Sequence, residues 1–305
     1  MAELLVVGTL ALDDVRTPFG EVTGALGGSA TYFAYAASFF TKVRLVAVVG
    51  RDFPKEHLDL LEGRGVDLAG VQIADGRTFR WSGEYGYDLN EARTLDTQLG
   101  VLADFRAKLP ERFHRTPYLF LANIDPEIQR DVLHRLERPR LVALDTMNYW
   151  IRGKREALDR VLAEVDVLLI NEAEARMLAD EPNLVKAARA IVGEGGKGPR
   201  RLVVKRGEYG ALLASAHRFF FVPAFPLEAV FDPTGAGDTF AGGALGALAR
   251  SDRVEEGAMR EAIVYGSVMA SFTVEDFSLN RLRRLTEEEI EARVRVFREM
   301  MQVGI

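Results

Sequence analysis

The chain of 305 residues contains no cysteine and only four histidines, and these two shortages exclude several kinds of site. Without cysteine it forms neither a disulfide nor a thiolate metal centre. The histidines do not pair at the spacing of a zinc-binding motif; they are His57, His114, His134 and His217. We therefore expect no structural zinc site.

Long apolar runs and an excess of basic residues are missing as well. No stretch approaches the roughly 20 apolar residues of a membrane-spanning helix. The apolar run that begins at Leu4 is interrupted by Asp13 and Asp14, and no basic residue precedes it. The formal net charge is −6 without a clustered basic face, which argues against nucleic acid as the main partner. We expect a soluble cytoplasmic protein that acts on a small molecule.

The chain does contain a regular alternation of short apolar runs with longer amphipathic segments. The short runs, rich in branched aliphatic residues as buried parallel strands are, lie at residues 4–7, 45–49, 118–121, 141–144, 167–170 and 202–204. Segments with a helical period lie at residues 29–40, 54–64, 128–136, 154–164, 172–178, 184–192, 255–273 and 287–300. This order predicts a doubly wound α/β fold, in which helices flank a mostly parallel sheet and the ligand lies beyond the carboxyl ends of the strands.

Two segments interrupt this alternation, at about residues 13–24 and 77–100. The second contains the strict alternation that is typical of a sheet with one exposed face. We expect the two segments to pair into a small β-sheet lid over the ligand edge. The alternative is an ordinary edge hairpin with surface aromatic residues. With no internal repeat or linker, residues 1–305 are expected to form a single domain.

One glycine-rich segment is discounted as a nucleotide site. Residues 193–198, GEGGKG, match the pattern G-x-G-x-x-G, but they follow a helical segment and precede a strand, the reverse of the order in a dinucleotide site. The lysine in this segment also lacks the following serine or threonine of a P-loop. We interpret the segment as the end of a helix and a loop.

Residues 232–243, DPTGAGDTFAGG, place two carboxylates around small residues at the start of a predicted helix. The amides of Gly235, Ala236 and Gly237 should lie free at the positive end of this helix, where they would stabilise the charge of a phosphoryl group in transfer. Asp238, in the first turn, would accept the proton of an attacking hydroxyl. The alternative is that the two carboxylates only cap the helix.

This segment resembles the C-terminal signature of the PfkB or ribokinase-like family of sugar and nucleoside kinases, D-T-x-G-A-G-D, with Pro233 in place of the usual threonine. Further segments resemble motifs of the same family in the same order, namely residues 27–34 with a di-glycine, 49–53, 171–174 with N-x-x-E, and 204–210. The resemblance covers nearly the whole chain. It implies a ribokinase-like fold with a β lid and transfer of the γ-phosphoryl group of ATP to an alcohol.

The resemblance implies a role for each motif at the nucleotide end. Asp238 becomes the general base, and the amides of residues 235–237 become an anion hole. Asn171 and Glu174 would organise Mg²⁺ largely through water, or else cap the helix after their strand. Lys205 would neutralise phosphate charge, or else be a solvated strand end. The residues placed at ATP are Asn171, Lys205, Gly207, Gly210 and Ser267.

Two further sites follow from the resemblance. Asp232 and Thr234 match the positions at which some members hold a monovalent cation such as K⁺. Asp13 matches a carboxylate that holds hydroxyls of the acceptor. Tyr32 replaces the usual asparagine, so that a ring of the acceptor stacks on it or it packs in the core. The residues placed at the acceptor are Asp13, Gly27, Gly28, Tyr32, Asp145 and Asn148, of which Asp145 could instead cap a helix.

The function predicted from these residues is an ATP-dependent phosphotransferase that acts on a sugar or sugar derivative. A nucleoside kinase on the same fold is the alternative, because the aromatic lid could seat a ribose and its base. A sensor that binds sugar or nucleotide without catalysis would lack the base or the hole-forming glycines, and both are present here. An exposed edge of the lid could also pair two subunits into a homodimer.

Overall fold

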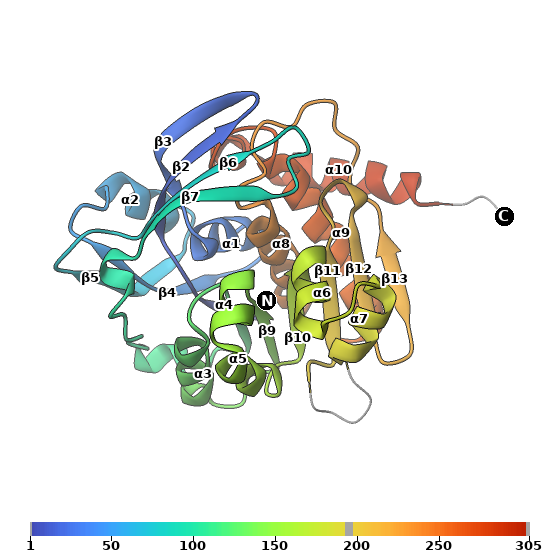
Figure 1. The fold of residues 1–305 in the computed structure, drawn as a ribbon, viewed down its shortest axis with the longest axis horizontal. Helices are drawn as coiled ribbons and strands as arrows, with labels where there is room; N and C mark the ends of the chain where they lie inside the picture. The colour runs from blue at the N-terminus through green and yellow to red at the C-terminus, as the bar shows by residue number, and fades with distance from the viewer. Residues whose placement is uncertain (1, 193–197, 303–305) are drawn as a thin grey trace.

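The computed structural model describes residues 2–192 and 198–302, and its strands form two sheets (Figure 1). The larger sheet has the order β13-β12-β11-β10-β9-β8-β1-β4-β5. Its strands are β1 (Leu4–Val7), β4 (Val43–Gly50), β5 (Asp67–Ala74), β8 (Tyr118–Leu121), β9 (Leu141–Asp145), β10 (Val167–Asn171), β11 (Arg201–Lys205), β12 (Ala211–Ser215) and β13 (Phe219–Val222). All pairs from β11 to β5 are parallel, whereas β12 and β13 pair antiparallel. The predicted mostly parallel sheet is confirmed.

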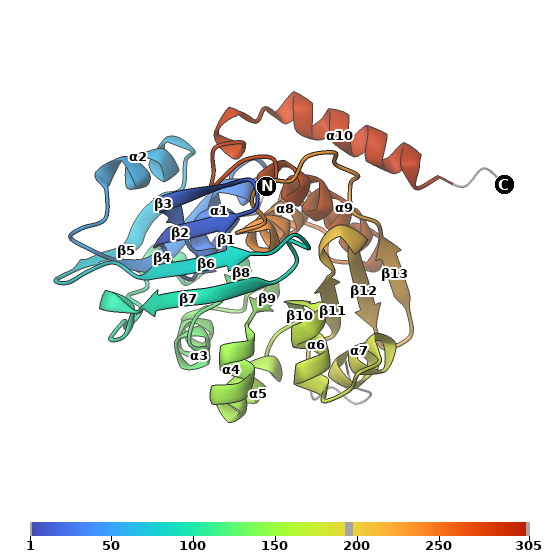
Figure 2. The same ribbon diagram turned by 45° about the horizontal axis from the view of Figure 1, so that its top comes forward.

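Helices cover both faces of this sheet, as the two views show (Figures 1 and 2). The helices are α1 (Ser29–Ala37), α2 (Lys55–Gly63), α3 (Pro126–Arg135), α4 (Asn148–Gly153), α5 (Arg155–Leu162), α6 (Glu172–Ala179), α7 (Leu184–Val192), α8 (Ala236–Ser251), α9 (Glu256–Thr273) and α10 (Glu287–Met300). Within β1, Leu4 and Val6 join the core formed with α1, α8, α9 and α10. Leu5 and Val7 point to the other face and join the core formed with α3, α5, α6 and α7. The alternation of side chains along a strand therefore supplies two cores from one apolar run.

The second sheet is the lid, with the order β3-β2-β6-β7. Its strands are β2 (Ala11–Thr17), β3 (Gly20–Gly27), β6 (Arg80–Tyr85) and β7 (Ala92–Gln98). Segments far apart in the sequence meet where β2 pairs in parallel with β6, with Asp13 opposite Trp81. Figure 2 shows this sheet lying across one edge of the larger one. The lid predicted from separated segments is confirmed, although its first hairpin extends beyond the expected residues 13–24 at both ends.

Three strands were not expected from the sequence: β5, β12 and β13. Each lies toward an outer end of the larger sheet. The glycine-rich pattern at residues 193–198 lies almost wholly outside the described residues. Within the part of the chain that the structure describes, no helix is long and apolar enough to cross a membrane.

Candidate active site

Three neighbouring strands end in polar residues at one edge of the larger sheet. Asp145 ends β9, Asn171 ends β10 and Lys205 ends β11, and the register aligns Asn171 with Lys205. The first turn of α8 lies at the same place, because a Cβ built on Gly237 would be 3.0 Å from Nζ of Lys205. The fold thus brings together four segments that the sequence separates.

The start of α8 presents free backbone amides. Its N-cap, Gly235, has φ 74°, in the left-handed region that favours glycine. The N–H of Ala236 donates to the carbonyl of Pro233 at 3.1 Å. Within residues 2–192 and 198–302, the amides of Gly235, Gly237 and Asp238 have no acceptor. The expectation of a free amide is therefore wrong for Ala236, whose N–H is engaged, whereas the amide of Asp238 is free; the anion hole itself remains a prediction.

Asp232 does not cap this helix, which has no side-chain cap. Its Oδ1 accepts from the amide of Thr234 at 2.9 Å, and its Oδ2 accepts from the amide of Ser278 at 3.3 Å. The buried carboxylate therefore ties the loop before α8 to the loop after α9. A monovalent cation at Asp232 and Thr234 remains a prediction.

Tyr32 is a core residue rather than an exposed stacking surface. Its exposed fraction is 2%, and a Cβ on Gly235 would overlap its ring. Burial raises the pKa of its hydroxyl well above the usual value, and the charges of Asp232 and Asp13 add to this. Of its two expected roles Tyr32 has the packing one, and contact with the acceptor remains a prediction. The ring explains why position 235 admits no side chain.

Asp238 lies half-buried in the first turn of α8. Burial, and next the charge of Asp145, together raise the pKa of its carboxyl group to about 8, although the ammonium of Lys205 opposes the increase. A carboxylate with a raised pKa is a better proton acceptor near neutral pH than an ordinary aspartate. The environment of Asp238 therefore suits a general base.

Lys205 is not a solvated strand end. Its side chain is 16% exposed and donates from Nζ to Oδ2 of Asp145 at 2.6 Å, where the Asp145 side chain is 6% exposed. Burial lowers the pKa of Lys205, but the charges of Asp145, Glu174 and Asp238 outweigh this and raise it overall. Lys205 therefore stays charged. Asp145, predicted at the acceptor, contacts this lysine, and its role at the acceptor remains a prediction.

Asn171 and Glu174 form a capping box at the start of α6. Oδ1 of Asn171 accepts from the amide of Glu174, and Oε2 of Glu174 accepts from the amide of Asn171, both at 2.8 Å. The capping role that the sequence left open is thus present. Burial raises the pKa of Glu174 to about 7, with the charge of Asp145 adding and Lys205 opposing. In the described residues, no group of three or more His, Cys, Asp or Glu side chains could hold a metal ion.

Asp13 lies on the lid strand β2 and is 5% exposed. A Cβ on Gly27 would overlap its carboxylate, and Gly28 has φ 97° as the N-cap of α1. Burial raises the pKa of Asp13 to about 7, opposed by the Gly28 amide and supported by the charges of Asp232 and Asp14. Its Oδ1 has no hydrogen-bond partner among the described residues. Because buried polar atoms are normally paired, this oxygen is suited to a donor on a ligand.

The residues predicted at the nucleotide differ in their surroundings. Gly207 has φ 54°, and a Cβ there would overlap Oδ1 of Asn90 in the lid. A Cβ on Gly210 would overlap the carbonyl of Val222, so this glycine serves the β12–β13 hairpin. Ser267 lies buried in α9, and its hydroxyl has no partner in the described part of the chain.

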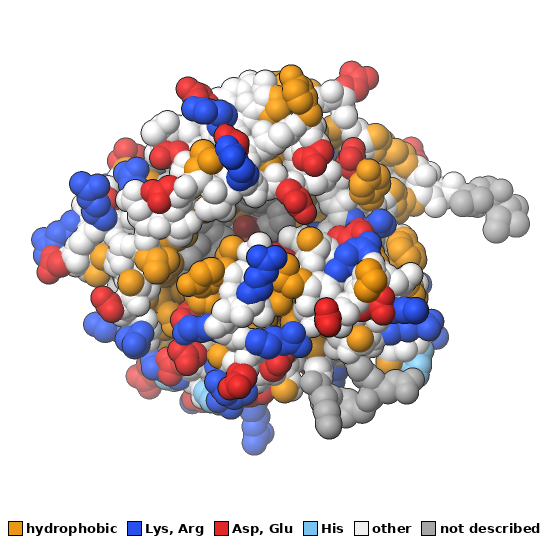
Figure 3. All heavy atoms as spheres, viewed as in Figure 1, with side chains coloured by type: hydrophobic (Ala, Val, Ile, Leu, Met, Phe, Trp, Pro, Cys, Tyr) orange, Lys and Arg blue, Asp and Glu red, His pale blue; other side chains and the backbone are white. Residues whose placement is uncertain are grey.

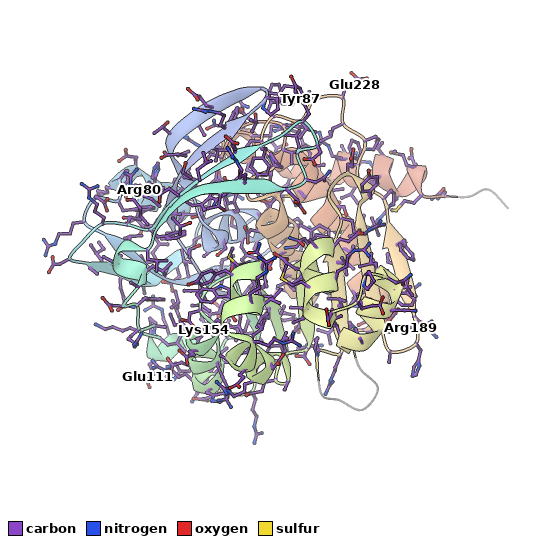
Figure 4. All side chains as sticks on the ribbon, viewed as in Figure 1. Arg80, Tyr87, Glu111, Lys154, Arg189 and Glu228 are labelled. Atoms are coloured by element: carbon purple, nitrogen blue, oxygen red, sulfur yellow. The ribbon has the colours of Figure 1, made fainter. Side chains whose placement is uncertain are left out.

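The inner face of the lid is aromatic. Trp81 is aligned with Asp13 across β2 and β6, and Tyr85 follows on the same face because side chains alternate along a strand. The hydroxyls of Tyr85 and Thr234 lie 3.3 Å apart, so the lid touches the loop before α8. Figure 3 shows a hollow on this side of the molecule between the lid and α4. Figure 4 shows Tyr87 at the free end of the lid, where it is 90% exposed.

Sequence reasoning missed a polar cluster beside Gly27 and Gly28, the two glycines predicted at the acceptor. Oδ1 of Asn123 accepts from Nε1 of Trp150 at 3.0 Å, its Nδ2 donates to Sδ of Met147 at 3.2 Å, and its carbonyl accepts from Oγ of Ser29 at 3.3 Å. The position of Asn123 just after the buried strand β8 could have predicted it, because polar residues at this end of a parallel strand lie at the ligand edge of the sheet. Asn148, predicted at the acceptor, is exposed at the start of α4.

Comparisons with known proteins agree with this geometry. The model of the pfkB family of carbohydrate kinases matches residues 5–283. A cytidine kinase of Thermococcus kodakarensis is 33% identical over 265 residues, which cover 84% of this chain and 92% of that protein. A deoxyribokinase of Salmonella typhi is 30% identical over 256 residues, 80% of each chain. The solved nucleoside kinase of Methanocaldococcus jannaschii has a TM-score of 0.77 at 19% identity and covers 97% of this chain and 99% of its own, a likeness of fold.

Proposed function

Because the chain belongs to the pfkB family and is a kinase, we propose that it moves the γ-phosphoryl group of ATP to the hydroxymethyl group of a nucleoside. The similarity to a cytidine kinase over most of both chains supports a nucleoside more than the free sugar preferred from the sequence. The shorter and weaker similarity to a deoxyribokinase keeps a pentose as the second candidate. Cytidine is therefore the first acceptor to test.

The observation that carries the proposal is the arrangement at the start of α8. Free amides of Gly235 and Gly237 lie beside Asp238, whose carboxyl group has its pKa raised to about 8. Amides at a helix N-terminus stabilise the charge that develops on a phosphoryl group. A neighbouring carboxylate removes the proton from the attacking hydroxyl. Both needs of phosphoryl transfer to an alcohol are thus met within one helical turn.

The acceptor lies, in this proposal, between the lid and the body. The unpaired Oδ1 of Asp13 accepts a hydrogen bond from a ribose hydroxyl, and Gly27, which has no side chain, leaves room for the carboxylate of Asp13. Trp81 and Tyr85 on the same face of the lid offer aromatic area to the base. The contact between Tyr85 and Thr234 closes the lid against the transfer site, and a closed lid excludes water that would hydrolyse the donor.

The residues at the donor end fit a nucleotide. The ammonium of Lys205 lies beside Gly237 and suits phosphate charge, and the unpaired hydroxyl of Ser267 suits a polar atom of the nucleotide. ATP supplies the phosphoryl group when it is bound. Magnesium would be organised through water by the side chains of Asn171 and Glu174, whose capping contacts leave Oε1 of Glu174 free of the cap.

The test is an ADP-release assay over cytidine, uridine, adenosine, inosine, ribose, 2-deoxyribose and fructose at saturating ATP and Mg²⁺. We expect kcat/KM for the best nucleoside to exceed that for every free sugar by about 100-fold, because buried polar groups that lose a partner penalise the wrong substrate strongly. A free pentose as the best acceptor would contradict the nucleoside and leave the kinase intact. The Asp13→Ala variant is the matched control, since it should lose the acceptor preference while it still binds ADP.

A further inference from the structure

Asp145 and Lys205 form a buried ion pair that spans three strands. Asp145 ends β9 and Lys205 ends β11, and the intervening β10 ends at Asn171 between them. Nζ of Lys205 donates to Oδ2 of Asp145 at 2.6 Å. Both side chains are largely out of solvent, at 16% and 6% exposed. A pair with this geometry and burial fixes the place of a flexible lysine far better than an exposed pair does.

The fixed place of the ammonium is the mouth of the anion hole. A Cβ on Gly237 would lie 3.0 Å from Nζ of Lys205, so the charge is in contact with the first turn of α8. The carboxylates of Glu174 and Asp238 also act on this ammonium. Asp145 and these two carboxylates therefore compete for the ammonium of Lys205. The carboxylate that holds the ammonium determines where its positive charge lies.

The contribution of Asp145 becomes clear from the alternative ion pair that Lys205 would form with Asp238. Without Asp145, the side chain of Lys205 would be free to pair with Asp238. Such an ion pair would occupy the carboxylate that has to accept a proton. Held by Asp145, the ammonium instead stays beside the free amide of Gly237, where phosphate charge arrives. The end of β9 is itself fixed, because Nε2 of Gln129 donates to the carbonyl of Asp145 at 3.0 Å.

We propose that Asp145 is a positioning residue for the phosphoryl donor: it holds the ammonium of Lys205 at the anion hole and away from Asp238, and it does not contact the acceptor. This rests on the proposed donor site and does not depend on which alcohol is phosphorylated. It replaces the acceptor role that the sequence indicated for Asp145.

The experiment measures the affinity for ADP by calorimetry, with Mg²⁺ and without an acceptor, for Asp145→Asn, Lys205→Met and the double variant. We expect each single change to weaken ADP binding by about 10- to 100-fold, the effect of losing a charge-assisted contact. In the Lys205→Met background, Asp145→Asn should weaken it no further, because two residues that act through one contact are not additive. Asp145→Glu should recover part of the loss.

The double variant also guards against a simple folding defect, because it removes both buried charges and leaves none unpaired. Asp67→Asn is the matched control: it breaks the ion pair of Asp67 with Arg112 at the start of β5, at the opposite edge of the sheet, and should leave ADP affinity unchanged. Steady-state assays with the best acceptor then separate the roles. Asp145→Asn should lower kcat and raise KM for ATP while KM for the acceptor changes by less than about twofold.

Three results would overturn the proposal. Unchanged ADP affinity with a raised KM for the acceptor would place Asp145 at the acceptor. Additive losses in the double variant would mean that Asp145 acts independently of Lys205. Full recovery of ADP affinity at tenfold higher Mg²⁺ would make Asp145 part of the metal site. If instead no nucleoside is phosphorylated, the binding results still stand, because they use no acceptor.

Discussion

Replacing Asp238 by asparagine should make the protein more stable and nearly inactive at the same time. In the folded chain, burial and the charge of Asp145 raise the pKa of Asp238 to about 8, against the opposing Lys205. In the unfolded chain this carboxyl group titrates near the ordinary value of 3.8. Between these two values, rising pH ionises the unfolded state first and draws the equilibrium toward unfolding. The asparagine of the Asp238→Asn variant does not ionise in either state, so rising pH does not destabilise the folded variant in this way.

The magnitude follows from the size of the shift and depends on pH. Below about pH 4 both states are protonated and the variant should match the wild type. The advantage of the variant then grows up to about pH 8 and is constant above it. One unit of pKa shift corresponds to ~1.4 kcal/mol, so we expect a gain of at least about 1 kcal/mol at pH 7.5, or ~2 °C in Tm for a chain of this size. Turnover should fall by about 10²- to 10⁴-fold, because the positioned base is lost.

Two assays check this prediction. Scanning calorimetry of the ligand-free protein at pH 4.5, 6 and 7.5 should show the difference in Tm between the variant and the wild type opening as pH rises. Asp75→Asn is the control, since the side chain of Asp75 is 85% exposed and neutralising it should not change stability in this way. A variant that is less stable at every pH, or one that keeps its turnover, would refute the account of Asp238 as a general base with a raised pKa.

The remaining predictions concern the surroundings of this base. Gly235→Ala should lower Tm in calorimetry by several degrees, because a left-handed alanine costs ~1 kcal/mol and its Cβ would overlap the ring of Tyr32 at a further ~1–3 kcal/mol; an unchanged Tm would contradict the packing. Tyr85→Phe should raise KM for the acceptor about 2- to 10-fold through the lost contact with Thr234, and a raised KM for ATP alone would not fit. Asp13→Asn should weaken acceptor binding by about tenfold or more in a titration while ADP binds normally.

Local sequence patterns predicted the buried elements well, because burial on both faces leaves a clear apolar run. β1 and β8 have the predicted bounds, and so does α7. β5 and β13 were missed because strands at the ends of a sheet pair on one side only and carry mixed patterns, such as the half-exposed residues of β5. Their place in the sheet depends on pairing with a neighbour, which no local pattern encodes.

At the site, the strand ends and the start of α8 could be predicted, because motif residues mark where each strand stops. The hydrogen-bond or packing partner of each side chain could not be predicted from the sequence. The contact between Lys205 and Asp145 joins residues 60 positions apart, and the burial of Tyr32 against Gly235 depends on how α1 packs on α8. The engaged amide of Ala236 depends on the turn at Pro233, where the sequence allowed several backbone conformations.

The lid contacts join the proposed donor end of the site to the proposed acceptor end. Tyr85 meets Thr234 just before the anion hole, and Asn90, past the end of the same strand, lies over Gly207 on the donor side and donates from Nδ2 to Glu208 at 3.5 Å. A lid that lifts from one of these points must strain or break the other, since both belong to one hairpin. The same segment that is proposed to cover the acceptor thus rests on the turn after β11, the strand whose last residue is Lys205. In the proposed reaction, closure over the alcohol would therefore reach the turn that follows Lys205, the lysine proposed to bind phosphate, so water should be excluded from both ends of the transfer together.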